Sequence, residues 1–111
     1  MKDFSFLVRV PVTYSPEQVK AANVKWNALI EQWKQDGIYI TSFPFPAEGY
    51  VISSSNQAEK KSVFSDNLRV VSNIFLRADS MEDAVELAKQ FPVLEYGGTV
   101  EVREIQVRPQ T

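Results

Sequence analysis

The sequence predicts an α+β fold whose strands and helices follow the order β-α-β-β-α-β. Two stretches, one beginning at Phe4 and one from Leu68 to Ala78, alternate apolar and polar residues with the period of a strand. Two other stretches have apolar residues at helical spacing, and each begins at a serine suited to cap a helix, Ser15 and Ser80. Because a strand pattern precedes and follows each helical stretch, we expect two β-α-β units.

Length and composition limit what the chain can be. With 111 residues, 44% of them hydrophobic, it is the size of one domain and can bury a core without disulfides or metals. We expect a single domain over residues 1–108 and a frayed tail over 109–111. Cysteine and histidine do not occur, which excludes disulfides, thiolate nucleophiles, Cys/His zinc sites and imidazole catalysis. We therefore expect neither a metal nor a cofactor.

Charge and hydropathy argue against two classes of partner. The net charge is −2 and the Lys and Arg residues are scattered, so we expect no nucleic-acid partner. No run of about 18 apolar residues occurs, and the first residues lead into a strand pattern without an apolar signal segment. These features predict no membrane partner and a cytoplasmic localisation.

The first strand is expected from Phe4 to Val12. Pro11 cannot donate a backbone hydrogen bond, so the strand should end there or lie at a sheet edge. One face of this strand is strongly apolar, since every even position carries a large hydrophobic residue: Phe4, Phe6, Val8, Val10 and Val12.

The first helix is expected to begin at Ser15 and to end at Gly37. Ser15 can serve as N-cap, and Gln18 stands at the capping-box position. Gly37 suits the left-handed residue that commonly ends a helix. We favour core packing for the two tryptophans, and the alternative makes Trp26 part of a pocket wall. Both belong to one apolar stripe, which comprises Val19, Ala22, Trp26, Leu29, Ile30 and Trp33.

The middle of the chain predicts a broken second strand. Residues 38–43 can form a short strand, after which Pro44 and Pro46 interrupt any ladder. Residues 50–53 can pair again. The polar stretch 54–67 predicts a hairpin connection or a mobile loop, and we favour a solvated loop over a binding arm.

The third strand is expected from Leu68 to Ala78, and its alternation defines two faces. One face should carry Leu68, Val70, Ile74, Leu76 and Ala78, and the other Arg69, Asn73, Phe75 and Arg77.

The second helix should begin at Ser80, with Asp83 completing a capping box, and should end at Pro92. The glycine pair 97–98 then predicts a turn that permits positive φ, before a last strand around Val100. The buried face of this helix is expected to comprise Met81, Ala84, Val85 and Ala88, flanked by Leu87 and Phe91.

Assembled, these elements predict a ferredoxin-like βαββαβ arrangement, with two helices on one face of a four-stranded antiparallel sheet. The helices would cover the apolar face of the sheet. The uncovered face would mix polar and apolar residues, which is unusual for a solvated sheet and fits an interface or a pocket. The uncovered face would carry Ser5, Leu7, Arg9, Asn73, Phe75, Arg77, Glu101 and Arg103.

The runs 77–89, 91–92 and 96–103 resemble the C-terminal half of the YCII-related family, including its DGPF branch. The resemblance implies a homodimer in which two ferredoxin-like subunits meet sheet to sheet, as a dimeric α+β barrel with a cleft between them. Two features of that family are absent. Lys60 to Val63 replace its Asp-Gly-Pro-Phe run, and Trp26 stands near the position of its helix histidine, so the His–Asp pair suspected of catalysis there does not carry over.

A cleft on the uncovered face could bind a small anionic or aromatic ligand. Arg9 and Arg103 would supply guanidinium groups, which bind carboxylates and phosphates through paired hydrogen bonds. The alternative is structural: Arg103 pairs with Glu101, with Glu104 or with an acidic residue of a partner subunit. Further candidates for this cleft are Trp26, Tyr39, Ser42, Asn73 and Arg77.

For catalysis by a carboxylate the candidates are Asp79 and Glu101. Asp79 is a weak candidate, because its position just before the Ser80 cap explains it structurally. We therefore favour a non-catalytic homodimer that binds a small molecule or acts as an accessory protein. The alternative is a small lyase, isomerase or dehydrochlorinase-like enzyme that acts on an aromatic or carbonyl compound in the dimer cleft.

Overall fold

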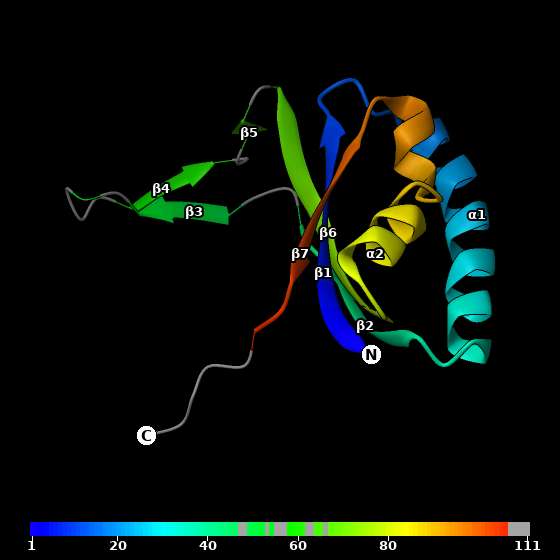
Figure 1. Ribbon diagram of the computed structural model, residues 1–111. Coiled ribbons are helices and arrows are strands. Elements are labelled where there is room, and N and C mark those ends of the chain that lie inside the picture. Colours follow the sequence, from blue (N-terminus) through cyan, green and yellow to red (C-terminus); the bar gives the residue numbers. More distant parts are fainter. Residues whose placement is uncertain (47–48, 53, 55–57, 62–63, 66, 107–111) are drawn as a thin grey trace.

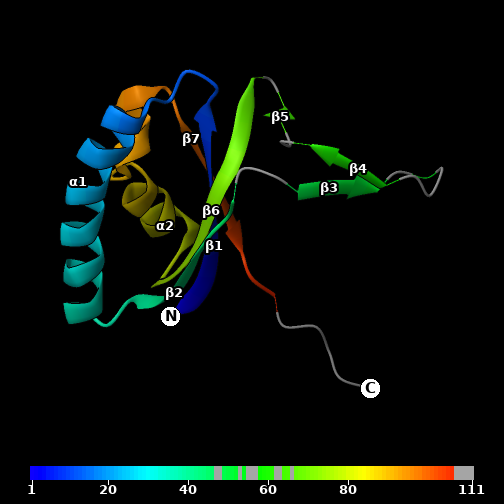
Figure 2. The same ribbon diagram turned by 180° about the vertical axis from the view of Figure 1, so that it is seen from behind.

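A computed structural model describes residues 1–46, 49–52, 54, 58–61, 64–65 and 67–106. Its main sheet has the strand order β2-β6-β1-β7 with all neighbours antiparallel, and both helices lie on one side of it (Figures 1 and 2). This architecture confirms the predicted α+β class and is compatible with a ferredoxin-like fold. The elements of this part are β1 (Lys2–Pro11), α1 (Pro16–Gln35), β2 (Tyr39–Pro44), β6 (Leu68–Ala78), α2 (Met81–Ala88), the 3₁₀ helix η1 (Pro92–Tyr96) and β7 (Thr99–Glu104).

The core lies between the sheet and the helices, and the even residues of β1 form its floor. Phe4, Phe6, Val8 and Val10 are all fully buried, as the alternation predicts. Val12 was expected on the same face but is 57% exposed, because β1 ends at Pro11.

Phe91, which lies between α2 and η1, packs its ring against α1 and β1 within this core. Its ring centroid lies 5.4 Å from that of Phe6, 4.8 Å from Trp26 and 5.6 Å from Trp33. Such clusters add edge-on aromatic contacts to the burial of large apolar area. Core packing is therefore confirmed for Trp33, whereas the partly buried Trp26 packs against the core and also lines a pocket, as the alternative predicted.

The capping box of α1 is formed as predicted. The Ser15 hydroxyl accepts from the Gln18 backbone N–H at 3.2 Å, and the Gln18 side chain accepts from the Ser15 backbone N–H at 2.9 Å. At the other end Asp36 is the C-cap, and Gly37 follows with a φ of 75°. Val19 is more exposed than its place on the predicted stripe suggests.

Helix α2 is shorter than predicted, and only part of its predicted buried face is buried. It begins after the Ser80 cap, as expected, but ends at Ala88, and Pro92 begins η1 instead of ending α2. Met81 and Val85 are exposed, because the helix rests on Ala84 and Ala88.

A β-bulge in β6 changes the predicted faces of that strand. Val8 of β1 opposes Ser72 and Arg9 opposes Val70, so Val71 is an extra residue in β6. Because the extra residue shifts the alternation, Val70 lies on the side of Arg9 and not with Ile74. The predictions that Leu68 and Val70 share the face of Ile74, and that Arg69 shares the face of Asn73, are therefore wrong.

Between β2 and β6 the chain forms a hairpin. Strand β3 (Gly49–Ile52) pairs with β4 (Ala58–Lys61) as a separate two-stranded sheet, which projects on the side away from the helices (Figures 1 and 2). Strand β5 (Phe64–Ser65) then pairs with β6 at Leu68 and Arg69, which β2 does not pair with. The hairpin option for 54–67 is thus confirmed for its described residues.

Residues 107–111, which include the predicted tail 109–111, lie outside the described part. Within that part, neither helix combines the length and the apolar character that crossing a membrane requires.

Candidate functional site on the open sheet face

The face of the main sheet opposite the helices is called the open face below. Because the even residues of β1 point into the core, its odd residues point to this side. Residues directly opposed in antiparallel strands share a face, so Arg103 opposite Ser5 lies on the side of Arg9, as predicted. By the same register the open face comprises Asp3, Ser5, Leu7, Arg9, Thr41, Phe43, Val70, Asn73, Phe75, Arg77, Thr99, Glu101 and Arg103.

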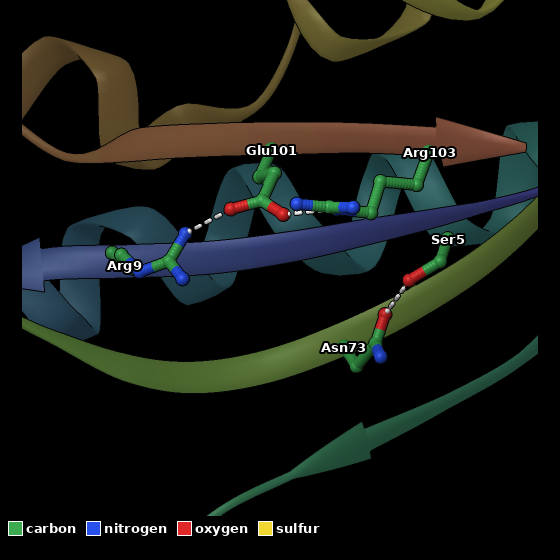
Figure 3. A network of polar contacts seen from close by, with 5 residues as sticks. All are labelled: Ser5, Arg9, Asn73, Glu101 and Arg103. Carbon is green, nitrogen blue, oxygen red and sulfur yellow. Dashed lines mark hydrogen bonds and ion pairs between the residues drawn. The ribbon is translucent and has the colours of Figure 1, made fainter. Parts of the chain in front are cut away.

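Glu101 lies between two arginines on this face. The Arg9 guanidinium donates from Nη1 to Glu101 Oε1 at 2.8 Å, and the Arg103 guanidinium donates from Nε to Glu101 Oε2 (Figure 3). The hydrogen bond from Arg103, and then that from Arg9, lowers the pKa of the Glu101 carboxyl below its usual 4.5. The group carries two positive charges against one negative charge, so it keeps a net positive charge.

Two more polar pairs flank this network. Ser5 Oγ donates to Asn73 Oδ1 at 2.7 Å across the β1–β6 pair (Figure 3). Arg77 Nε lies 3.8 Å from Asp3 Oδ1 near the end of the same two strands. Asn73 and Arg77 thus lie on the face where they were predicted.

Apolar side chains complete the open face beside these charges. Leu7 and Phe75 are half-buried, whereas Phe43 is 53% exposed. The rings of Phe43 and Phe75 meet nearly edge to face, with centroids 6.2 Å apart. Phe75 and Arg103 both oppose Ser5, from the strands on either side of β1, so they share one face of the sheet with β1 between them.

Three predicted site residues lie on the opposite side of the sheet. Trp26 belongs to α1 and packs in the core. Tyr39 opposes Leu76 and Ser42 opposes Ile74, and both partners are buried under the helices. A bulge in β2 between Tyr39 and Thr41 produces this arrangement, which simple alternation does not show.

The Tyr39 and Ser42 hydroxyls are hydrogen-bonded to each other at 2.7 Å. Trp26, Tyr39 and Ser42 all lie on the helix side of the sheet. They therefore cannot line one cleft of this subunit together with Arg9 and Arg103. Asp79 is also apart from the open face, since it is an exposed residue between the end of β6 and the Ser80 cap.

Sequence reasoning missed Thr41, Phe43 and Asp3 as members of the open face. Phe43 lies in the predicted strand, but its face depends on the β2 bulge. Asp3 lies before the predicted start of the first strand, which in fact begins at Lys2. A mixed polar and apolar pattern extended to these positions is the signal that could have found them.

Within the described residues, no cluster of three or more Asp or Glu side chains is arranged to hold a metal ion. A comparison of the chain with protein-family models and with curated proteins found no match.

Proposed function

We propose that this chain forms a homodimer through its open faces and binds a small anionic, aromatic ligand there without catalysis. It would thus be a small-molecule-binding or accessory protein. The observation that carries the proposal is the uncovered sheet face, on which the Arg9–Glu101–Arg103 network shares one surface with Leu7, Phe75 and Phe43.

The apolar part of the open face supports dimerisation. A sheet face with a leucine and two phenylalanines in water exposes apolar area that a second sheet would bury. The YCII-like run 77–103 points to the same arrangement, because that family is expected to pair sheet to sheet.

The β3–β4 hairpin supports it independently. Tyr50 and Ile52 of β3 are 66% and 69% exposed, and the hairpin extends away from the main sheet on the side of the open face (Figure 1). A lone two-stranded hairpin is only marginally stable in water. A second copy placed against the open face would lie within its reach and could cover both side chains.

The charge network supports an anionic ligand. Arg9 and Arg103 share a single carboxylate, so each guanidinium has donors left for another acceptor. A carboxylate or phosphate on the ligand would balance the remaining positive charge. On the same face, Phe75 of β6 and Phe43 of β2 offer rings on which an aromatic ligand can stack or pack edge-on.

The state of Glu101 favours binding over catalysis. An efficient general acid or base has a pKa near the working pH. The two arginines move the pKa of Glu101 in the opposite direction, away from neutrality. The carboxylate is therefore suited to fix the arginines in place.

Isothermal titration with 2-naphthoate tests the ligand. We expect Arg9→Gln to weaken naphthoate binding by about tenfold, the effect of losing one charge-assisted hydrogen-bond pair. Lys25→Gln is the matched control, because it removes the same charge from α1, on the other side of the sheet. Equal weakening by both variants, or no binding by the wild type at millimolar naphthoate, would contradict the proposal.

A further inference from the structure

A cavity of about 270 Å³ lies on the helix side of the sheet, separated from the open face by the sheet itself. We propose that it is a second binding site, for a neutral and largely apolar aromatic molecule of one or two rings. Its described lining comprises Val8, Tyr14, Val19, Ala22, Asn23, Trp26, Pro44, Val71, Ser72 and Val93.

The cavity follows from how α1 lies over the sheet. The α1 backbone approaches η1 and β2 most closely, and β2 ends at Pro44. Near its N-terminal half α1 offers the small Ala22 toward the sheet. A small side chain above a sheet that has lost its edge strand leaves space unfilled.

The β6 bulge shapes the floor of this space. Val71 is the extra residue of the bulge, and both Val71 and Ser72 line the cavity. In a regular strand two successive residues would point to opposite faces. Bulges re-aim side chains in this way and are frequent beside functional sites.

Two aromatic walls are held in place from behind. The Trp26 ring packs nearly edge to face on Phe91 at 4.8 Å and on Trp33 at 5.8 Å. The Tyr14 ring packs on Tyr96 at 5.9 Å. Because these contacts already fix the rings, a ligand would not need to order them, which reduces the entropic cost of binding.

The lining favours a neutral ligand. None of its described side chains is charged, and its polar groups come from Tyr14, Asn23, Ser72 and the Trp26 indole. Burial raises the pKa of Tyr14, as does the neighbouring Tyr96, so the Tyr14 hydroxyl stays protonated at neutral pH. Transferring a carboxylate into such surroundings would be strongly unfavourable.

The size favours one or two rings. An apolar cavity of about 150 Å³ holds a benzene molecule. The present cavity is nearly twice as large, at about 270 Å³, and has polar groups that a hydroxyl on the ligand can meet.

The test is a titration of the full chain with 2-naphthol and with 2-naphthoate, followed by ¹H–¹⁵N NMR. We expect saturable shifts with naphthol at the backbone amides of Ala22, Trp26 and Ser72, and none there with naphthoate. Shifts with naphthoate on the open face, at Leu7 or Glu101, belong to the proposed function, so either site can fail alone. Naphthol shifts that do not saturate, or that fall on the open face, would overturn the inference.

A filled cavity gives the second arm. Ala22→Leu places three more carbons in the cavity and should weaken naphthol binding by at least about tenfold. Ala21→Leu makes the same change at an exposed neighbour and should leave the affinity within about twofold. Unchanged affinity in a folded Ala22→Leu chain would also overturn the inference, and the wild-type NMR map decides if that variant does not fold.

Discussion

Gly98 shows at the scale of one residue how tightly the last strand approaches the first. A Cβ at this position would lie 2.7 Å from the Arg9 carbonyl oxygen and 2.9 Å from both Cβ and the carbonyl oxygen of Val93. These atoms belong to the backbone of a central strand and to a buried side chain, so they cannot move away easily. The glycine pair predicted as a turn thus has two separate reasons, since Gly97 has a φ of 82° and Gly98 has no room for a side chain.

We expect Gly98→Ala to lower the free energy of unfolding by about 2 kcal/mol, as overpacking of a core does. Gly49→Ala is the matched control, because nothing lies within 4 Å of its added Cβ and its φ is not positive. It should change the free energy of unfolding by less than about 0.5 kcal/mol. Urea denaturation of the three chains measures both values, and equal values for the two variants would refute the close approach.

Glu101 gives a prediction about pH. Its pKa is lower in the folded chain than the ordinary 4.5, so its ionisation stabilises the fold above that pH. This contribution is lost as the pH falls through the folded-state pKa. The difference in unfolding free energy between the wild type and Glu101→Gln should therefore be constant near neutrality and shrink below about pH 4.5.

Urea denaturation at several pH values measures this difference. Glu31→Gln is the control, since Glu31 pairs with Lys34 at 3.6 Å on the exposed side of α1 and such pairs add little. A Glu101→Gln difference that does not vary with pH would show that the arginines do not hold the carboxylate.

Alternation in the sequence was enough to place single residues of β1 and β7. Arg9, Glu101 and Arg103 lie on the predicted face because both strands are regular through the paired residues. Alternation could not show that the Glu101 carboxylate accepts hydrogen bonds from both arginines at once. The choice of partner depends on side-chain conformations, and the sequence left Glu101 and Glu104 as alternative partners of Arg103.

At the scale of elements, the ends and irregularities of strands were the parts that the pattern could not supply. The β6 bulge moved Val70 and the β2 bulge moved Ser42, because one extra residue reverses a period of two. Helix α2 was predicted too long, since a proline cannot lie in the interior of a helix but does not require the preceding helix to continue up to it. Capping residues, by contrast, were reliable at Ser15 and Ser80 because the cap is a local interaction.

The β3–β4 hairpin is expected to contribute Tyr50 and Ile52 to the proposed dimer interface. The double variant Tyr50→Ala and Ile52→Ala should raise the dimer dissociation constant by about tenfold or more, because it removes two side chains that the partner would bury. It should leave the far-UV circular dichroism unchanged. Val24→Ala is the control, since Val24 is 73% exposed on α1, away from the open face. A dissociation constant that does not change in the hairpin variant would remove the hairpin from the interface.

At the scale of the whole molecule, the sheet separates two surfaces of different chemistry. The open face combines arginines with aromatic rings, and the cavity under α1 is apolar and uncharged in its described lining. The order of the elements and the apolar face of the sheet followed from the sequence. Beyond the alternative that made Trp26 a pocket wall, the cavity did not, because it results from the end of β2, the bulge of β6 and the small Ala22 of α1 together.

Sedimentation velocity on the wild type and on Phe75→Glu at micromolar concentration tests the dimer most directly. We expect twice the mass of one chain for the wild type. We expect the mass of one chain for Phe75→Glu, because the new carboxylate would lose its hydration when two open faces meet and the apolar contact of the ring would be lost. A monomeric wild type, or a Phe75→Glu chain that remains a dimer, would contradict dimerisation through the open face.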